Sequence, residues 1–307
     1  MANSVEYFRR RLLRSWQLYV MLALPLLWLI IFQYWPMWGA QIAFRNFLPG
    51  DGITTADWVG LKNFQRFFDS AVFWQLLRNT LLLSFYSLVV GFPIPIIFAL
   101  SLNQLRLGFF KQSVQMISYA PYFISTVVLV GMLLQFLDLR HGPVNMLLMW
   151  LGREPIHFMG NASMFRSIYV WSGVWQFTGF STVIYLAALS TIDTTLHEAA
   201  VMDGANRLQR IANIDLPGIM PTAVTLLILN IGQLINIGFE KIYLMQNPLN
   251  TSVSEVISTY VYKVGLIGGL TNYSYAAAIG IFNSVIGLIL LYLANLLAKR
   301  LTGNGLW

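Results

Sequence analysis

The chain has 307 residues, of which 57% are hydrophobic and only 10% are charged. Soluble globular domains carry about 25% charged residues, so this composition excludes a water-soluble protein of this size and indicates solvation by lipid. The absence of cysteine excludes disulfides, thiol nucleophiles and cysteine-ligated metals. The formal net charge is +7. Because the basic residues lie between apolar runs, we interpret them as flanks that contact anionic lipid and not as a nucleic-acid surface.

Six apolar segments are each long enough to cross a bilayer as a helix, which needs about 20 residues. In chain order they cover roughly residues 17–38, 80–103, 113–137, 167–189, 218–239 and 276–298. Segments of this length are too long for barrel strands, so the sequence predicts an all-α polytopic membrane protein. We expect a basic N-terminal segment at 1–16, followed by one six-helix transmembrane domain at 17–307.

The first segment has an alternative interpretation as a cleaved signal peptide, because a basic run at 9–14 precedes it. The apolar run from Leu18 to Phe32 continues into an aromatic stretch at 33–38. Such a stretch is typical of a membrane interface and lacks the small residues of a cleavage site. We therefore predict an uncleaved first helix.

The basic residues near the spans predict the orientation of the chain. Ten Lys and Arg residues flank the spans on the side of the N-terminus: Arg9, Arg10, Arg11, Arg14, Arg106, Lys111, Arg207, Arg210, Lys299 and Arg300. Basic residues concentrate on the cytoplasmic side, and those before the first helix usually dominate. We therefore expect the N-terminus in the cytoplasm, and six spans return the C-terminus to the same side.

Prolines interrupt several of the apolar segments. Among them are Pro25, Pro93, Pro95 and Pro121. A proline removes a backbone donor and kinks its helix, so we expect bends that either form a cavity or serve packing alone.

The segment between the fourth and fifth spans, residues 190–217, carries the clearest local signals. Thr195 and Glu198 have the spacing of a capping box, which predicts a helix start there. Gly204 is the expected left-handed residue at the end of that helix. Pro217 is expected to close a second helix before the fifth span. The orientation predicted above places this loop in the cytoplasm.

The same loop resembles the EAA motif of the permeases of binding-protein-dependent ABC importers, E-A-A-x-x-D-G-A-x(8)-I-x-L-P. The matching residues are Glu198, Ala199, Ala200, Asp203, Gly204, Ala205, Ile214, Leu216 and Pro217. The family usually has an aromatic residue in the middle of the second helix, where this chain has Ile211. The small side chains of Ala199 and Ala200 leave a slim face, as a helix in a protein groove needs.

The resemblance implies the type I ABC importer permease fold and a bacterial inner-membrane location. It implies that the loop docks on a cytoplasmic ATPase through Glu198, Ala199, Ala200, Asp203, Gly204, Ala205, Arg207, Ile211 and Pro217. It also implies a second homologous permease subunit, which would form a heterodimer with this chain. Two ATPase subunits and an extracytoplasmic solute-binding protein would complete the complex.

Shorter stretches resemble the sugar-uptake branch of these permeases. They are Val59–Phe64, Phe73-Trp74 and Asn79-Thr80. Others resemble a narrower branch for oligosaccharides and polysaccharides, including uronate polymers such as alginate: Pro121–Ser125, Asn247-Pro248, Thr259–Tyr262 and Gly305–Trp307. The resemblance therefore implies a saccharide substrate.

The chain lacks the G-x-x-x-x-G-K-[ST] phosphate loop, and its three histidines have no metal-ligand spacing. We expect no enzyme activity, no catalytic residue, no metal and no cofactor on this chain. The resemblance places ATP and Mg²⁺ at the partner ATPase subunits.

An ion-coupled secondary transporter or a channel is the alternative function. Such carriers usually need an ionisable residue within the bilayer, and the predicted span cores contain none. A sodium site built from backbone carbonyls stays open.

Polar residues within the spans are candidates for a substrate pathway. Asn230, Gln233 and Asn236 follow one side of the fifth span at three-residue spacing. The other candidates are Trp171, Trp175, Gln176, Gln135 and Asn283, with Thr178, Ser181 and Thr182 on the fourth span. Amides and hydroxyls bind sugars by hydrogen bonds, but amides also join helices and tryptophans anchor helix ends. Both interpretations stay open. The loops at 39–79, 138–166 and 240–275 are expected to face the binding protein.

Overall fold

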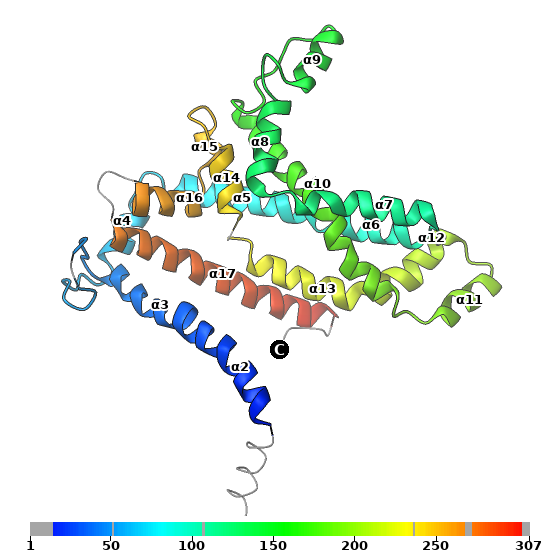
Figure 1. Cartoon of the computed structure of the whole chain (residues 1–307), viewed down its shortest axis with the longest axis horizontal. Coiled ribbons are helices and arrows are strands. Elements are labelled where there is room, and N and C mark those ends of the chain that lie inside the picture. Colours follow the sequence, from blue (N-terminus) through cyan, green and yellow to red (C-terminus); the bar gives the residue numbers. More distant parts are fainter. Residues whose placement is uncertain (1–14, 51, 106–107, 236, 268–271, 303–307) are drawn as a thin grey trace, which may run out of the picture. The chain divides into compact units, whose positions relative to one another are not determined.

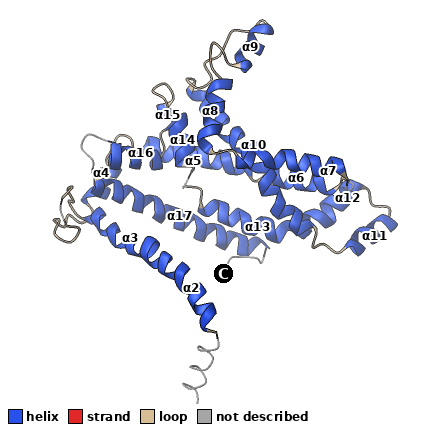
Figure 2. Cartoon of the chain, viewed as in Figure 1, coloured by secondary structure: helices blue, strands red, loops and turns tan. Residues whose placement is uncertain are grey.

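The computed structural model describes residues 15–50, 52–105, 108–235, 237–267 and 272–302. Throughout these residues the regular secondary structure is helical, with one isolated bridge between Arg45 and Trp58 and no strand (Figures 1 and 2). The all-α prediction is confirmed.

The chain divides into two compact units. The smaller unit comprises Met1–Phe67 and Val264–Ile281, and the larger comprises Phe68–Lys263 and Phe282–Trp307. The predicted boundary after residue 16 stays a prediction.

The smaller unit begins with an apolar helical run that continues without a loop. It consists of α2 (Trp16–Leu29), the π turn η1 (Ile30–Tyr34), α3 (Trp35–Met37) and the 3-10 helix η2 (Trp38–Phe44). The most apolar part of this run has no buried residue, so its surface is available to lipid or to another subunit. The unit continues with α4 (Lys62–Phe68), η5 (Lys263–Ile267) and the start of α17 (Tyr273–Thr302), where Phe67 packs edge-on against Tyr275.

The larger unit is organised around one long helix, α10 (Ala162–Leu189), which contacts α5, α6, α7 and α13. Its other elements are α5 (Phe73–Gly91), α6 (Pro93–Asn103), α7 (Phe109–Tyr119), η3 (Ala120–Phe123), α8 (Thr126–Phe136), α9 (Pro143–Trp150), α11 (Thr194–Met202), α12 (Arg207–Arg210), η4 (Ile211–Asp215), α13 (Leu216–Gly232), α14 (Phe239–Met245), α15 (Thr251–Ser254), α16 (Ile257–Tyr262) and the end of α17. Buried clusters around Phe165 and around Tyr185 hold the two halves of α10 in this packing.

Four helical runs in the described residues are long and apolar enough to span a membrane: Trp16–Phe44, Phe73–Asn103, Arg207–Gly232 and Tyr273–Arg300. A fifth candidate is the pair Phe109–Phe123 and Thr126–Phe136, which is bent by 98°. Pro121, where the sequence predicts a kink, lies in η3, just before this break. The predicted fourth span is the 28-residue helix α10, which falls outside this set. The helix α10 contains Ser, Thr and Gln side chains, and these lower its mean hydropathy below that of the other spans. The total of six spans and the cytoplasmic termini therefore stay predictions.

Candidate coupling loop and central cavity

The first helix of the loop, α11, begins at Thr194 with Asp193 as its N-cap. The Asp193 carboxylate accepts a hydrogen bond from the Thr195 N–H at 2.9 Å. This bond holds the pKa of the Asp193 carboxyl below its usual range. The predicted capping box of Thr195 with Glu198 is therefore wrong. Asp193, two residues earlier, accepts from one of the free N–H groups instead, and its charge suits the positive end of the helix dipole.

Gly204 ends α11 in the left-handed conformation, as predicted, with φ of +77°. The Ala205 N–H donates to the Ala200 carbonyl at 2.8 Å, and the Gly204 N–H donates to the Val201 carbonyl at 3.0 Å. These two bonds form a Schellman motif. No atom lies within 4 Å of a Cβ placed on Gly204, so the backbone conformation, and not space, requires glycine here.

The second helix of the loop has the capping box that the sequence analysis placed on the first. The Asn206 side chain accepts from the Gln209 N–H at 2.9 Å, and the Gln209 side chain accepts from the Asn206 N–H at 2.8 Å. This helix continues through η4 into α13, so the prediction that Pro217 closes it is wrong. Pro217 lies at the start of α13, directly after a π turn, where the register change accommodates its missing N–H.

Asp215 joins the two helices of the loop to α6. Its side chain is fully buried, and one carboxylate oxygen lies 3.2 Å from Nε2 of His197 on α11. The other accepts a hydrogen bond from Gln104, just after α6, at 3.1 Å. Sequence analysis missed this network, although an acidic residue at the start of an apolar span was a signal for it. The network couples α11 to α6 and to the start of α13.

The loop presents apolar side chains to its surroundings. Met202 is 87% exposed and Leu208 is 76% exposed, and α11 has no buried residue. Among the motif residues, Glu198, Ala199, Asp203, Gly204, Arg207 and Pro217 are exposed, and Ala200, Ala205 and Ile211 are partly buried. Figure 1 shows α11 and α9 beyond opposite ends of α10. An exposed apolar surface of this kind suits a protein partner.

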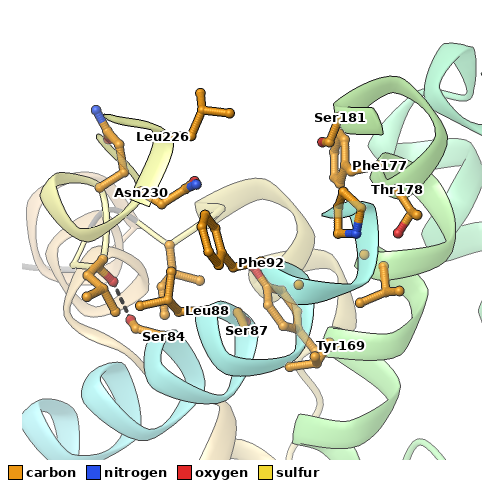
Figure 3. Close-up of a pocket in the computed structure, with 18 of the residues that line it drawn as sticks. Ser84, Ser87, Leu88, Phe92, Tyr169, Phe177, Thr178, Ser181, Leu226 and Asn230 are labelled. Atoms are coloured by element: carbon orange, nitrogen blue, oxygen red, sulfur yellow. Dashed lines mark hydrogen bonds between the residues drawn. The ribbon is translucent and has the colours of Figure 1, made fainter. Parts of the chain in front are cut away.

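A cavity of about 550 Å³ lies between α5, α10 and α13. Its polar wall contains Ser84, Ser87, Thr178, Ser181, Asn230 and Gln233, and its aromatic wall contains Phe92, Tyr169, Phe177 and Tyr185. Figure 3 shows Ser84 and Ser87 on α5, Thr178 and Ser181 on α10, and Asn230 on α13 around this space. Ser84 Oγ donates to the Leu234 carbonyl oxygen. Hydroxyls, amides and aromatic faces in one cavity can bind the polar and C–H surfaces of a sugar.

The cavity contains part of the predicted pathway. Asn230 and Gln233 line it, whereas Asn236 lies outside the described residues. The residues that form its wall do not include Trp171 or Trp175, which are 53% and 49% exposed. Trp171 Nε1 donates to the Tyr86 hydroxyl at 3.2 Å.

The other three predicted residues also lie elsewhere. Gln176 is buried and donates to the Ile124 carbonyl at 2.8 Å, which ties α10 to the bend before α8. Gln135 lines a second, smaller cavity with Asp138 and His141. Asn283 is partly buried on α17. Sequence analysis missed Ser84, Ser87, Tyr169 and Lys241, which line the main cavity. In the sequence Lys241 directly follows Glu240 in the stretch 239–245, and such a pair of opposite charges gives no clear signal for a cavity residue.

An all-helical membrane protein with a polar cavity between its helices and an exposed capped helix at one end has the build of a transporter's membrane subunit. A profile of the family described as "binding-protein-dependent transport system inner membrane component" matches residues 79–303. Those residues make up most of the chain, so this chain belongs to that family and is an inner-membrane component.

Two relatives from Bacillus subtilis (strain 168) match nearly the whole chain. Protein LplB is 43% identical over 94% of this chain and 91% of its own length. The polygalacturonan/rhamnogalacturonan transport system permease protein YteP is 42% identical over 97% of this chain and 92% of its own length.

Solved structures agree with this family. A chain of a bacterial ABC transporter involved in the import of the acidic polysaccharide alginate has a TM-score of 0.89 and 39% identity, covering 96% of this chain and 99% of that chain. A chain of the alginate transporter in complex with an alginate pentasaccharide-bound periplasmic protein matches equally well. A chain of the MetNI methionine ABC transporter, with a TM-score of 0.56 and 17% identity, shares the fold alone. The fold is that of the type I ABC importer permeases.

Proposed function

We propose that this chain is a membrane-spanning permease subunit of an ATP-driven importer, which carries a saccharide delivered by an extracytoplasmic binding protein. The observation that carries this proposal is the full-length likeness to a chain of the alginate importer, at 39% identity and a TM-score of 0.89. The cavity between α5, α10 and α13 supports it, because its hydroxyl, amide and aromatic groups suit a sugar.

The substrate class is an acidic oligosaccharide. The relatives above 35% identity whose descriptions specify a sugar are linked to alginate and to polygalacturonan, which are both polymers of uronic acids. Relatives described as transporting neutral sugars, trehalose/maltose and lactose, are 29% and 27% identical. The more similar of these relatives are thus linked to acidic polysaccharides, and the less similar ones to neutral sugars.

The complete importer contains this chain, a second homologous permease, two ATPase subunits that bind ATP and Mg²⁺, and the binding protein. A complex of the related alginate importer with its loaded periplasmic protein supports this composition. Six spans with both termini in the cytoplasm then place α11 on the ATPase side and α9 on the side of the binding protein. This chain itself catalyses no reaction.

The loop at 190–217 couples ATP hydrolysis to transport. The exposed side chains of Met202 and Leu208 insert into the ATPase surface, and closure of the ATPase dimer moves α11. Asp215 transmits this movement, because it joins α11 to the end of α6 and to α13. Both α6, through Pro95, and α13, through Asn230, line the cavity. The bundle thereby alternates between inward-facing and outward-facing states.

Asn230 and Gln233 hold the sugar hydroxyls, together with the serine and threonine side chains of α5 and α10. Each such hydrogen bond contributes about 0.5–1.5 kcal/mol, which is weak enough for the sugar to leave. Phe177, which is 47% exposed, offers a ring face to the C–H side of the sugar.

The test uses the tagged chain, purified from its native membrane with its bound subunits and reconstituted into proteoliposomes. We expect uptake of labelled oligogalacturonate that requires both internal ATP and the binding protein. Uptake driven by a sodium or proton gradient without ATP would support the secondary-transporter alternative and overturn the proposal.

A further inference from the structure

Lys241 is a buried charged residue on α14 that lines the cavity. Only 7% of its surface is exposed. Its Nζ donates to the Tyr169 carbonyl at 3.0 Å and lies 4.8 Å from the centre of the Tyr169 ring. Among the residues that the structure describes, no carboxylate lies within ion-pair distance of Nζ. An ammonium group can donate three hydrogen bonds, and one of them goes to the neutral Tyr169 carbonyl. This environment therefore supplies no negative charge to neutralise the ammonium.

None of the described residues that line the cavity is acidic. Within the described part of the chain, Lys241 is the one charged side chain that lines this cavity. Its Nζ would lie 3.4 Å from a Cβ on Gly173 of α10, so the glycine leaves open space beside the ammonium. The other polar groups of this wall are thus uncharged hydroxyls and amides, and they lie beside aromatic rings.

An unpaired buried cation destabilises a fold, because a carbonyl and a ring replace only part of its hydration. The need to attach α14 to α10 does not explain why a lysine is buried at position 241. Ile242 and Met245 on the same helix are fully buried in a cluster with Tyr169, so α14 is already anchored by apolar contacts. Lys263, in contrast, lies 2.7 Å from Glu255 and is paired. Ligand pockets use a few polar or charged groups to bind and orient their ligands, so a buried charge on a cavity wall is a candidate for ligand binding.

We propose that Lys241 binds a carboxylate of an acidic saccharide in the cavity and so determines the preference for uronate over neutral sugar. This inference rests on the proposed transport function. A lysine ammonium is a compact charge with rotatable donors, so it can follow a carboxylate as the sugar advances, without the fixed two-point grip of an arginine. A single cation also holds the sugar weakly enough to release it.

The test compares Lys241→Met, Lys241→Arg and Lys263→Gln in the reconstituted complex. The two probes are trigalacturonate and its carboxyl-reduced neutral counterpart. Binding of each probe to the detergent-purified complex is measured by saturation-transfer NMR, and ATP-dependent uptake of trigalacturonate is measured in proteoliposomes. Lys241→Met keeps the length of the side chain and removes an unpaired buried charge, so the fold is retained.

We expect Lys241→Met to weaken trigalacturonate binding by about tenfold and to leave the neutral probe unchanged, because a hydrogen bond to a charged group is lost. Lys241→Arg should restore most of the preference. Lys263→Gln removes the same charge outside the cavity and should change neither probe. An unchanged ratio of acidic to neutral binding in Lys241→Met, with ATP-dependent uptake intact, overturns this inference alone. A wild-type complex with no ATP-dependent saccharide uptake overturns the proposed function, and this inference with it.

Discussion

The loop at 190–217 and the central cavity are built in opposite ways. Local hydrogen bonds define the loop: Asp193 to Thr195, Ala205 to Ala200, and Asn206 to Gln209. The cavity takes its wall from residues 84 to 241, on helices that meet only in the folded chain. A local motif tolerates little change at its few special positions, whereas a wall of many weak contacts loses function in small steps. The following predictions test this difference, from the largest expected effect to the smallest.

Gly204→Val should nearly abolish transport. A β-branched residue at φ of +77° is strained, and the Schellman motif that ends α11 would open. The chain should still insert into the membrane, because no span is altered. The measurement is uptake in proteoliposomes, with membrane insertion checked by protease accessibility.

Gly131→Val is the matched control for Gly204→Val. Gly131 also has no atom within 4 Å of an added Cβ, but its φ is not positive. It should therefore retain transport. Normal uptake by Gly204→Val would refute the coupling role of the loop.

Asp215→Ala should reduce uptake by about tenfold. It should reduce substrate-stimulated ATPase activity by a smaller factor. The substitution leaves His197 and Gln104 without their buried partner, at a cost of about 1–3 kcal/mol. A double-mutant cycle with His197→Ala measures the coupling between the two residues. Strictly additive effects on uptake would show that the contact transmits nothing.

The same contrast explains what could be predicted from the sequence. Gly204 was predicted correctly because its role depends on its own backbone angle. Pro121 was predicted correctly because a proline cannot donate a backbone hydrogen bond, and the chain changes there from α7 to the 3-10 helix η3 before the bend. The capping box was assigned to the wrong helix because several polar residues near a helix start can act as caps, and spacing does not choose between Asp193 and Thr195.

The cavity was predicted only in part, since its residues come together through packing between helices. Asn230 and Gln233 share one helix side, which periodicity detects. Their partners Ser87 and Lys241 lie on other elements, and nothing in the local sequence relates them to α13. Gln176 was indistinguishable from a pathway residue until its bond to Ile124 placed it between α10 and the bend before α8.

Asn230→Ala and Gln233→Ala should each raise the KM for uptake by about 2- to 10-fold, which corresponds to one lost hydrogen bond. The yield of the assembled complex should stay unchanged, because both side chains are exposed to the cavity. Gln176→Ala is the matched comparison. Its amide is buried and bonded, so it should lower the yield and leave KM unchanged. Lower yield for all three variants would assign Asn230 and Gln233 to helix packing.

Asp193→Ala should have the smallest effect, because other groups and water can partly replace one exposed cap. Hydrogen exchange at the Thr195 amide should accelerate several-fold, as expected for a lost N-cap, while uptake falls only slightly. The hydrogen bond lowers the pKa of Asp193, so its contribution is fully present above the unfolded pKa of about 3.9 and is lost as the pH falls through the folded value. The exchange rate of the wild type should therefore approach that of the variant only in acid, after correction for intrinsic exchange. Asp193→Asn keeps the acceptor without the charge and should protect Thr195 at every pH. If Asp193→Asn exchanged as fast as Asp193→Ala, the charge on the helix dipole, and not the hydrogen bond, would hold the start of α11.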